Sequence, residues 1–95
     1  MKRYSIVPTK AYRKAIKRLT KAGFKLEKLE RAINTLASGN ALGPEYQDHG
    51  LSGEFKDRRV CHIGPDWLLM YRKENTALIL LLVDTGSHRD VLKIE

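Results

Sequence analysis

The sequence contains one cysteine, Cys61, so no disulfide can form within the chain. A chain of this kind suits a reducing compartment. Cys61 stands in a run of residues typical of a β-strand, which predicts a small buried hydrophobic side chain rather than a nucleophile.

Long hydrophobic runs are missing as well. The longest, residues 77–83, falls far short of the roughly 20 residues that a helix needs to cross a bilayer. The first residues contain no continuous apolar segment of the kind that a signal peptide has. We therefore expect a cytoplasmic protein with no membrane partner.

The sequence has no internal repeat, no heptad array and no tract rich in proline, glycine or serine. Its 95 residues are 42% hydrophobic and 31% charged, which is ordinary for a small globular domain. We expect residues 1–95 to form one domain.

Acidic residues are the minority among the charged ones. The 11 Asp and Glu residues stand against 18 Lys and Arg residues, which gives a net charge of +7 at pH 7. Such an excess in a short chain favours polyanionic partners. Nucleic acid, an acidic protein and an anionic membrane surface all have the required charge.

The first part of the chain predicts a strand and then a helix. Residues 3–7 are rich in β-branched and aromatic side chains and are followed by Pro8, as in a short strand before a turn. Thr9 stands where a helix N-cap is expected. A helix over residues 10–21 with a very basic outer face follows, and its apolar positions are Ala11, Ala15, Ile16 and Leu19.

A second helix is expected between the break at Ala22 and Gly23 and the end at Gly39 and Asn40. Its apolar stripe consists of Leu26, Leu29, Ile33 and Leu36. Because only a short break separates the two helices, we expect a helical hairpin.

The second half of the chain predicts a loop and then a sheet. Residues 39–53 hold four of the seven glycines and are typical of a loop with one short extended piece. Strands are indicated over residues 55–63, 67–73 and 77–83; the last is apolar on both faces, as a central strand covered by helices would be. With a helical turn over residues 87–95, the fold class is α+β: a strand, a two-helix hairpin and a twisted antiparallel sheet.

Three histidines are the most informative polar residues. His49, His62 and His88 each stand at a loop or strand end, and Asp66 follows His62 by four positions. One interpretation is a solvated or structural role, and another is a zinc site, although the spacing matches no compact ligand motif. The third is cleavage of RNA, in which imidazoles deprotonate a 2′-hydroxyl and protonate the leaving 5′-oxygen.

Cleavage of RNA also requires a cation for the phosphate and benefits from a surface for the base. Four candidate cations lie near the histidines in sequence: Lys56, Arg59, Arg72 and Arg89. Trp67 is either a core aromatic or a stacking partner for a base. A two-residue connection at Gly64 and Pro65 would place His62 opposite Trp67 on one face of the sheet.

The segment DHGLSGEFKDRRVCHIGPDWLLMY, followed by DTGSHRDVL, resembles the YafQ branch of the RelE/ParE toxin superfamily, the ribosome-dependent mRNA interferases of bacterial toxin–antitoxin pairs. The matching pattern is D-H-x-L-x-G-x-(aromatic)-K, then R-x-x-H, then P-D-W-x-L-x-Y, then T-G-(S/T)-H. It runs in order from Asp48 to His88, and the N-terminal half agrees with the family in architecture and length.

The resemblance implies a RelE-like fold with the site on the sheet face away from the helices. It also implies that mRNA is cut in the ribosomal A site by attack of the 2′-hydroxyl, without metal or cofactor, through His49, His62, Asp66 and His88. Within this set, His88 would be the general acid and Asp66, with His49, the general base. His62 would position or stabilise the phosphate.

The resemblance implies partners too: a small acidic antitoxin that wraps the toxin in a higher-order complex, and the 70S ribosome with its mRNA. A net charge of +7 suits both. The sequence also departs from the family. Leu92 stands where a phenylalanine is common, Val60 replaces a common acidic residue, and Arg58 precedes the matched Arg59.

Two other functions are compatible with the sequence. A ParE-like toxin of the same fold would inhibit a protein target such as DNA gyrase, but the three histidines argue against it. A non-catalytic RNA- or ribosome-binding module would use the basic helix face and would leave the histidines without a role.

Overall fold

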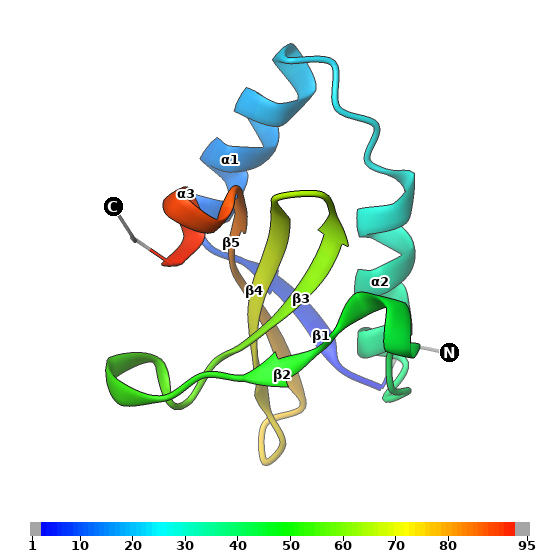
Figure 1. The fold of residues 1–95 in the computed structure, drawn as a ribbon. Helices are drawn as coiled ribbons and strands as arrows, with labels where there is room; N and C mark the ends of the chain where they lie inside the picture. The colour runs from blue at the N-terminus through cyan, green and yellow to red at the C-terminus, as the bar shows by residue number, and fades with distance from the viewer. Residues whose placement is uncertain (1–2, 93–95) are drawn as a thin grey trace.

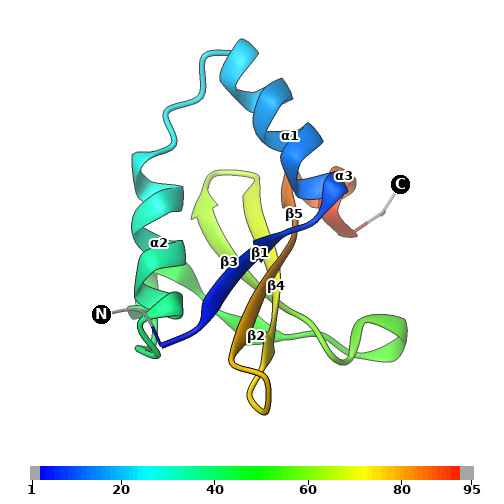
Figure 2. The same cartoon turned by 180° about the vertical axis from the view of Figure 1, so that it is seen from behind.

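A computed structural model describes residues 3–92 of the protein. A five-stranded sheet with strand order β1-β5-β4-β3-β2 carries two helices on one face (Figure 1 and, from behind, Figure 2). The strands are β1 (Ser5–Pro8), β2 (His49–Gly50), β3 (Arg59–Gly64), β4 (Trp67–Glu74) and β5 (Ile79–Gly86). The helices are α1 (Lys10–Lys21), α2 (Glu27–Ala37) and α3 (His88–Leu92), with short 3-10 turns η1 (Pro44–Tyr46) and η2 (Gly53–Phe55). The predicted α+β class is confirmed.

Helix α1 begins and ends where its local sequence directs. The Thr9 side chain accepts a hydrogen bond from the backbone N–H of Tyr12 at 3.1 Å, which confirms the predicted N-cap. At the other end Gly23 takes a left-handed φ of 87°, which allows the Phe24 N–H to reach the carbonyl of Leu19 at 3.0 Å. The prediction for Ala11 is wrong: it is exposed, and Tyr12 occupies the buried face instead.

Helix α2 also matches its predicted range, and its first turn carries Glu27 and Glu30, which interact favourably with the positive end of the helix dipole. Residues 22–26 separate the two helices. Helix α1 packs along β5 and α2 lies against β3, so that each helix covers its own part of the sheet (Figures 1 and 2).

The sheet is mixed rather than purely antiparallel, which corrects the prediction of an antiparallel sheet. Strand β1 pairs in parallel with β5, from Ser5 opposite Ile79 to Pro8 opposite Leu82. The remaining pairs are antiparallel. The parallel pair joins two strands that are far apart in the sequence, so no local sequence pattern predicts it.

The central strand is β4, not the strand predicted over residues 77–83. Leu68, Leu69, Met70 and Tyr71 of β4 are all at most 1% exposed, so β4 is buried on both faces. Strand β5 lies inside the sheet between β1 and β4, but it starts at Ile79 and alternates between buried and half-buried residues. Its second face is only partly covered.

The strand predicted over residues 55–63 is shorter than expected. Residues 53–55 form the turn η2, and β3 begins only at Arg59. Lys56 therefore lies in the turn before the strand. The loop predicted over residues 39–53 contains β2 as its short extended piece. The predicted C-terminal helical turn is α3, and residues 93–95 lie outside the described part of the chain.

The sheet separates two apolar clusters. The larger lies between the sheet and helices α1 and α2, with Leu29, Leu36, Leu69 and Tyr71 among its buried members. The smaller lies on the opposite face, where Val91 of α3 packs with Val60, Leu68 and Met70. Cys61 belongs to the larger cluster and is 0% exposed, as predicted. Burial raises the pKa of its thiol to about 12, so the thiol is not a nucleophile near neutral pH.

None of the helices within residues 3–92 is long and apolar enough to cross a membrane.

Candidate active site

The three histidines come from three elements and meet on the sheet face opposite α1 and α2. His49 is in β2, His62 is in β3 and His88 is the first residue of α3. The ring centroid of His62 lies 6.2 Å from that of His49 and 5.4 Å from that of His88. His62 is thus the middle member of a row of three imidazoles.

Asp66 closes one end of this row through His88. It occupies the β3–β4 turn with a left-handed φ of 50°, a conformation that aspartate tolerates better than most residues. Its Oδ1 accepts two bonds from His88, one from the backbone N–H at 2.9 Å and one from Nδ1 at 2.6 Å. The backbone bond first, and then the ring bond, hold the pKa of Asp66 below its ordinary value.

The bond between the two side chains also indicates the tautomer of His88. A carboxylate only accepts hydrogen bonds, so Nδ1 of His88 carries a hydrogen toward Asp66. When Nε2 also carries a hydrogen, that hydrogen can be donated while Nδ1–H stays bonded to Asp66.

His49 is oriented in the same way by a different group. Its Nδ1 lies 2.7 Å from the carbonyl oxygen of Gln47, which can only accept. In neutral His49 the hydrogen therefore sits on Nδ1, and the lone pair of Nε2 is left to accept a proton. His49 is exposed and His88 is half-buried, so both histidines lie outside the core.

His62 differs from its neighbours in its electrostatics. Burial first, and then the proximity of His88 and His49, lower its pKa below the ordinary value for histidine. A lowered pKa favours the neutral form of His62 near pH 7, which has one N–H to donate.

The predicted pairing of His62 with Trp67 is wrong. The hairpin turn consists of Pro65 and Asp66, with Gly64 opposite Trp67, and an irregularity between His62 and Gly64 puts His62 opposite Leu68. Side chains alternate along a strand, so this register sends His62 and Trp67 to opposite faces. Trp67 packs against the larger apolar cluster, which lies between the sheet and helices α1 and α2 and is called the helix-side cluster below.

The position of Trp67 is fixed by two contacts. Its Nε1 donates to Thr85 Oγ1 at 3.0 Å, and its ring meets Phe24 edge to face with centroids 5.2 Å apart. Trp67 also lines, with Asp66, a cavity of about 390 Å³. A role for Trp67 in binding a base stays a prediction.

The four predicted cations are spread over the molecule. Arg59 and Arg72 are engaged by carboxylates, Arg59 by Asp48 at 3.3 Å and Arg72 by Glu74 at 3.2 Å and Asp57 at 3.6 Å. Lys56 follows η2 and is exposed. Arg89 follows His88, and its charge helps to lower the pKa of Asp66. Arg89 is therefore the candidate cation whose charge acts on Asp66, the partner of His88. The phosphate-binding roles of all four cations stay predictions.

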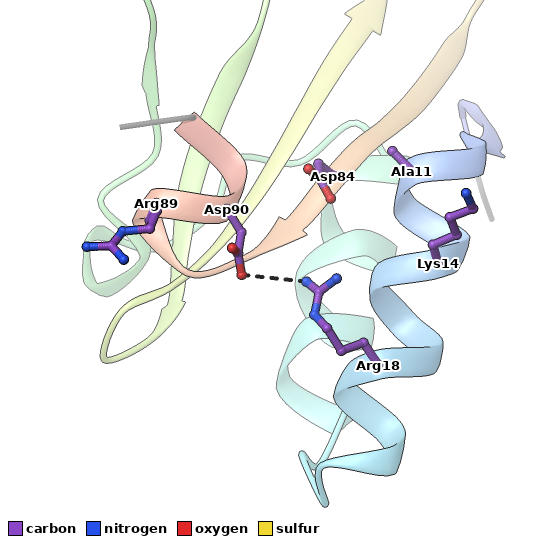
Figure 3. A pocket seen from close by; sticks show the side chains of 6 residues that line it. All are labelled: Ala11, Lys14, Arg18, Asp84, Arg89 and Asp90. Atoms are coloured by element: carbon purple, nitrogen blue, oxygen red, sulfur yellow. Dashed lines mark ion pairs between the residues drawn. The ribbon is translucent and has the colours of Figure 1, made fainter. Parts of the chain in front are cut away.

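A second polar feature adjoins α3. A cavity of about 370 Å³ between α1 and α3 is lined by Ala11, Lys14, Arg18, Asp84, Arg89 and Asp90 (Figure 3). Arg18 Nη2 and Asp90 Oδ2 form an exposed ion pair across it at 3.7 Å. Part of the basic face predicted for the first helix thus lies beside the helix that starts with His88.

The sequence interpretation missed two sets of polar contacts. Asp48 accepts hydrogen bonds from Tyr71 and Arg59, and Thr85 holds Trp67. Asp48 and Tyr71 both belong to the matched family pattern, which was the one available signal. Within residues 3–92, no group of three or more His, Cys, Asp or Glu side chains is arranged to hold a metal ion.

Comparison with known proteins identifies the family. A sequence profile described as bacterial toxin of type II toxin–antitoxin system, YafQ, matches residues 4–93. The mRNA interferase toxin YafQ of Escherichia coli K12 is 33% identical over 78 residues, which cover 81% of this chain and 83% of that protein.

Solved structures agree. A metal-bound toxin from Helicobacter pylori is 40% identical, with a TM-score of 0.87 over 93% of this chain and 98% of that one. YafQ in the E. coli DinJ–YafQ toxin–antitoxin complex is 29% identical, with a TM-score of 0.84 over 94% and 97% of the two chains. The resemblance stated from the sequence is confirmed, and the chain belongs to the YafQ family of toxins of bacterial type II toxin–antitoxin systems.

Proposed function

We propose that this toxin cleaves ribosome-bound mRNA in the A site by acid–base catalysis, with His49 and His88 at opposite ends of the reacting phosphodiester. The toxin is an endoribonuclease of the mRNA interferase type, as the E. coli relative is named. The observation that carries the proposal is the row of three imidazoles, oriented at one end by the Gln47 carbonyl and at the other by Asp66.

The base in this mechanism is His49. Its Nε2 takes the proton of the 2′-hydroxyl while the 2′-oxygen forms a bond to the adjacent phosphorus. The family resemblance gave Asp66 a share in this role. Two observations favour His49 alone, since Oδ1 of Asp66 is occupied by His88 and its lowered pKa makes it a weak base.

The acid is His88. The bond from phosphorus to the 5′-oxygen breaks as Nε2 of His88 gives its proton to that oxygen, so one proton is taken up and one released. The products are a 2′,3′-cyclic phosphate and a 5′-hydroxyl. Asp66 accepts from Nδ1 of His88 and holds the ring in place during the transfer.

The neutral middle histidine, His62, donates an N–H to a phosphate oxygen between the two proton-transfer groups. Arg89, beside His88, supplies positive charge for the developing phosphorane. Lys56, Arg59 and Arg72 serve as contacts to more distant parts of the RNA or ribosome.

The partners follow from the family and the charge. E. coli YafQ has been solved with the antitoxin DinJ. By analogy, residues 1–95 form one toxin domain, which a cognate acidic antitoxin neutralises in a higher-order complex in the cytoplasm. The other partner is the 70S ribosome with its mRNA, and a net charge of +7 suits both encounters.

The test is cleavage of mRNA on purified 70S ribosomes with a defined codon in the A site. Wild type should yield cuts phased with the codon, while His88→Ala and His49→Ala should lose most of the rate and still bind the antitoxin. EDTA should leave the rate unchanged, because the proposed steps use only side chains. Full cleavage by both histidine variants would overturn the mechanism, and gyrase inhibition without cleavage would favour the ParE-like alternative.

A further inference from the structure

We propose that Asp48 is a positioning residue that, through Tyr71 and Arg59, fixes the place of His49 in the active site. The inference rests on the proposed function, in which His49 is the catalytic base. Asp48 is not one of the four catalytic residues, and its proposed role is to hold the base in place.

His49 needs such a support because the strand that carries it is weak. Strand β2 has only two residues, pairs only with β3, and lies at the edge of the sheet. His49 stands opposite Val60 and Gly50 opposite Arg59, and both β2 residues are exposed. A strand of this length gains little from backbone pairing and nothing from burial of its own side chains.

Apolar contacts on either side of β2 hold the segment only coarsely. Tyr46 packs against the helix-side cluster and Leu51 against the cluster beneath α3. Between them, Gln47, His49 and Gly50 are exposed. Asp48 is the one residue of this stretch that is half-buried, with a side chain 20% exposed.

Asp48 connects the edge strand to the centre of the sheet. Its Oδ1 accepts a hydrogen bond from the Tyr71 hydroxyl at 2.7 Å and one from Arg59 Nε at 3.3 Å. Tyr71 belongs to the central strand β4 and is 0% exposed. Its burial, with the bond to Asp48, raises its pKa, so the hydroxyl keeps its hydrogen and remains a donor.

The bonds from Tyr71 and Arg59 to Asp48 form the anchor of this segment. The anchor also determines to which face of the sheet His49 points. Tyr71 lies in the helix-side cluster, so its bond draws the Asp48 side chain toward that side of the sheet. Successive side chains of a strand point to opposite faces, which directs His49 to the face where His62 lies. The two residues thus share one backbone constraint.

The hydrogen bond that orients the ring of His49 depends on the same segment, residues 47–49. Its Nδ1 meets the carbonyl of Gln47, which takes a left-handed φ of 48°, an uncommon conformation for a residue other than glycine. Asp48 lies between these two residues, and its anchor holds the peptide units that aim the carbonyl at the ring. Loss of the anchor should therefore free the imidazole as well as the backbone.

The chain offers a matched control for removing the Tyr71 hydroxyl. Tyr4 is also buried, at 5% exposure, and its hydroxyl donates to Asn75 Oδ1 at 2.6 Å without touching β2. Tyr71→Phe and Tyr4→Phe each delete one hydroxyl that donates to a side-chain oxygen. Both should lower the Tm, but only Tyr71→Phe should affect His49.

Cleavage on programmed ribosomes gives the first readout. Tyr71→Phe and Asp48→Ala should lower kcat by about 10- to 100-fold with little change in KM, since small misplacements of a catalytic group cost this much. Asp48→Asn should retain more activity than Asp48→Ala, because its amide oxygen still accepts from Tyr71. Tyr4→Phe should cleave at the wild-type rate.

The tautomer of His49, read from the ¹⁵N shifts of its ring by NMR, gives a second readout that requires no cleavage. We expect one tautomer, with hydrogen on Nδ1, in wild type and Tyr4→Phe, and a mixture in Tyr71→Phe. An unchanged tautomer in Tyr71→Phe, or equal kcat for the two tyrosine variants, would overturn the anchor and leave the acid–base proposal intact. If instead His49→Ala cleaves like wild type, the proposed function fails, and the NMR result alone decides the anchor.

Discussion

Asp66 concentrates two jobs on one oxygen atom. Its Oδ1 accepts the backbone N–H and the ring Nδ1 of His88, so one carboxylate both holds the start of α3 and faces the proposed acid. The backbone bond needs only an acceptor, whereas stabilising a charged imidazolium needs the negative charge. A substitution that keeps the acceptor and removes the charge separates the two jobs.

Asp66→Asn is that substitution. Asparagine tolerates the left-handed conformation at this position and keeps an oxygen for the His88 N–H, so the fold should be retained. The rate of mRNA cleavage should fall by about 100-fold, the scale of a general-acid contribution. Single-turnover rates with saturating toxin measure this, and a variant within a few-fold of wild type would show that the charge of Asp66 is dispensable.

We expect His62 to make the stability of the toxin depend on pH. Its pKa is lowered in the folded chain, by burial and then by His88 and His49, so the unfolded chain binds a proton at higher pH than the folded chain does. The stability associated with neutral His62 is present above the ordinary histidine pKa of about 6.5 and is lost as pH falls through the lower folded value.

Replacing this histidine with glutamine should flatten that dependence. Between about pH 7.5 and about pH 5.5, the Tm of His62→Gln should fall less than that of wild type, because glutamine takes up no proton in this range. Thermal unfolding followed by circular dichroism at the two pH values checks this. Parallel decreases for the two proteins would place the pH dependence elsewhere in the molecule.

At the scale of elements, Thr9 joins the start of α1 to the sheet. Its Oγ1 accepts from the Tyr12 N–H at 3.1 Å and donates to the Val83 carbonyl at 2.7 Å. The hydroxyl thus caps the helix and ties it to β5, along which α1 packs.

Thr9→Ala removes both bonds and should destabilise the fold by about 2 kcal/mol, the sum of a lost cap and a lost hydrogen bond. For a domain of this size, the Tm should fall by roughly 10 °C. Thr9→Ser keeps the hydroxyl and should remain close to wild type. Equal stability of the alanine and serine variants, measured by urea unfolding, would contradict this role.

The elements differ in how well the sequence predicts them. The bounds of α1 were predictable because Thr9, the apolar spacing and Gly23 act within a few residues of one another. The parallel pairing of β1 with β5 was not, since it joins Ser5 to Ile79 and has no local signature.

The site divides along the same line. The histidines could be chosen from residue type and the family pattern. The side to which Trp67 points could not, because it depends on a shift of register at the hairpin. The bonds from His88 to Asp66 and from Tyr71 to Asp48 span 22 and 23 positions, and they form only once the strand order of the sheet is set.

For the whole molecule, the sheet separates stability from chemistry. The larger cluster fills the space under α1 and α2, while the smaller one beneath α3 covers only part of the other face and leaves the histidine row accessible. Strand β4 is buried on both sides and supports both faces. A change of charge on the surface, outside the two apolar clusters and the histidine row, can therefore alter how fast the toxin associates with its partners without disturbing the site.

Helix α1 is the densest source of such charge. It contains six basic residues and no acidic one: Lys10, Arg13, Lys14, Lys17, Arg18 and Lys21. Lys14 and Arg18 line a cavity together with Arg89 and Asp90 of α3 (Figure 3). Because α3 begins with His88, the basic face lies next to the helix that carries one of the three histidines. If this face guides the toxin to the ribosome, its charge should act on association and not on the chemical step.

Lys14→Glu with Lys17→Glu tests this, since it lowers the net charge from +7 to +3, two units for each reversal, and leaves the Arg18–Asp90 pair in place. At low salt kcat/KM for programmed ribosomes should fall about 10-fold with kcat unchanged, and the difference should shrink as salt screens the charges. Lys25→Glu with Arg31→Glu gives the same net charge with both changes outside α1. Equal losses in the two double variants would mean that overall charge, not the face of α1, governs the encounter.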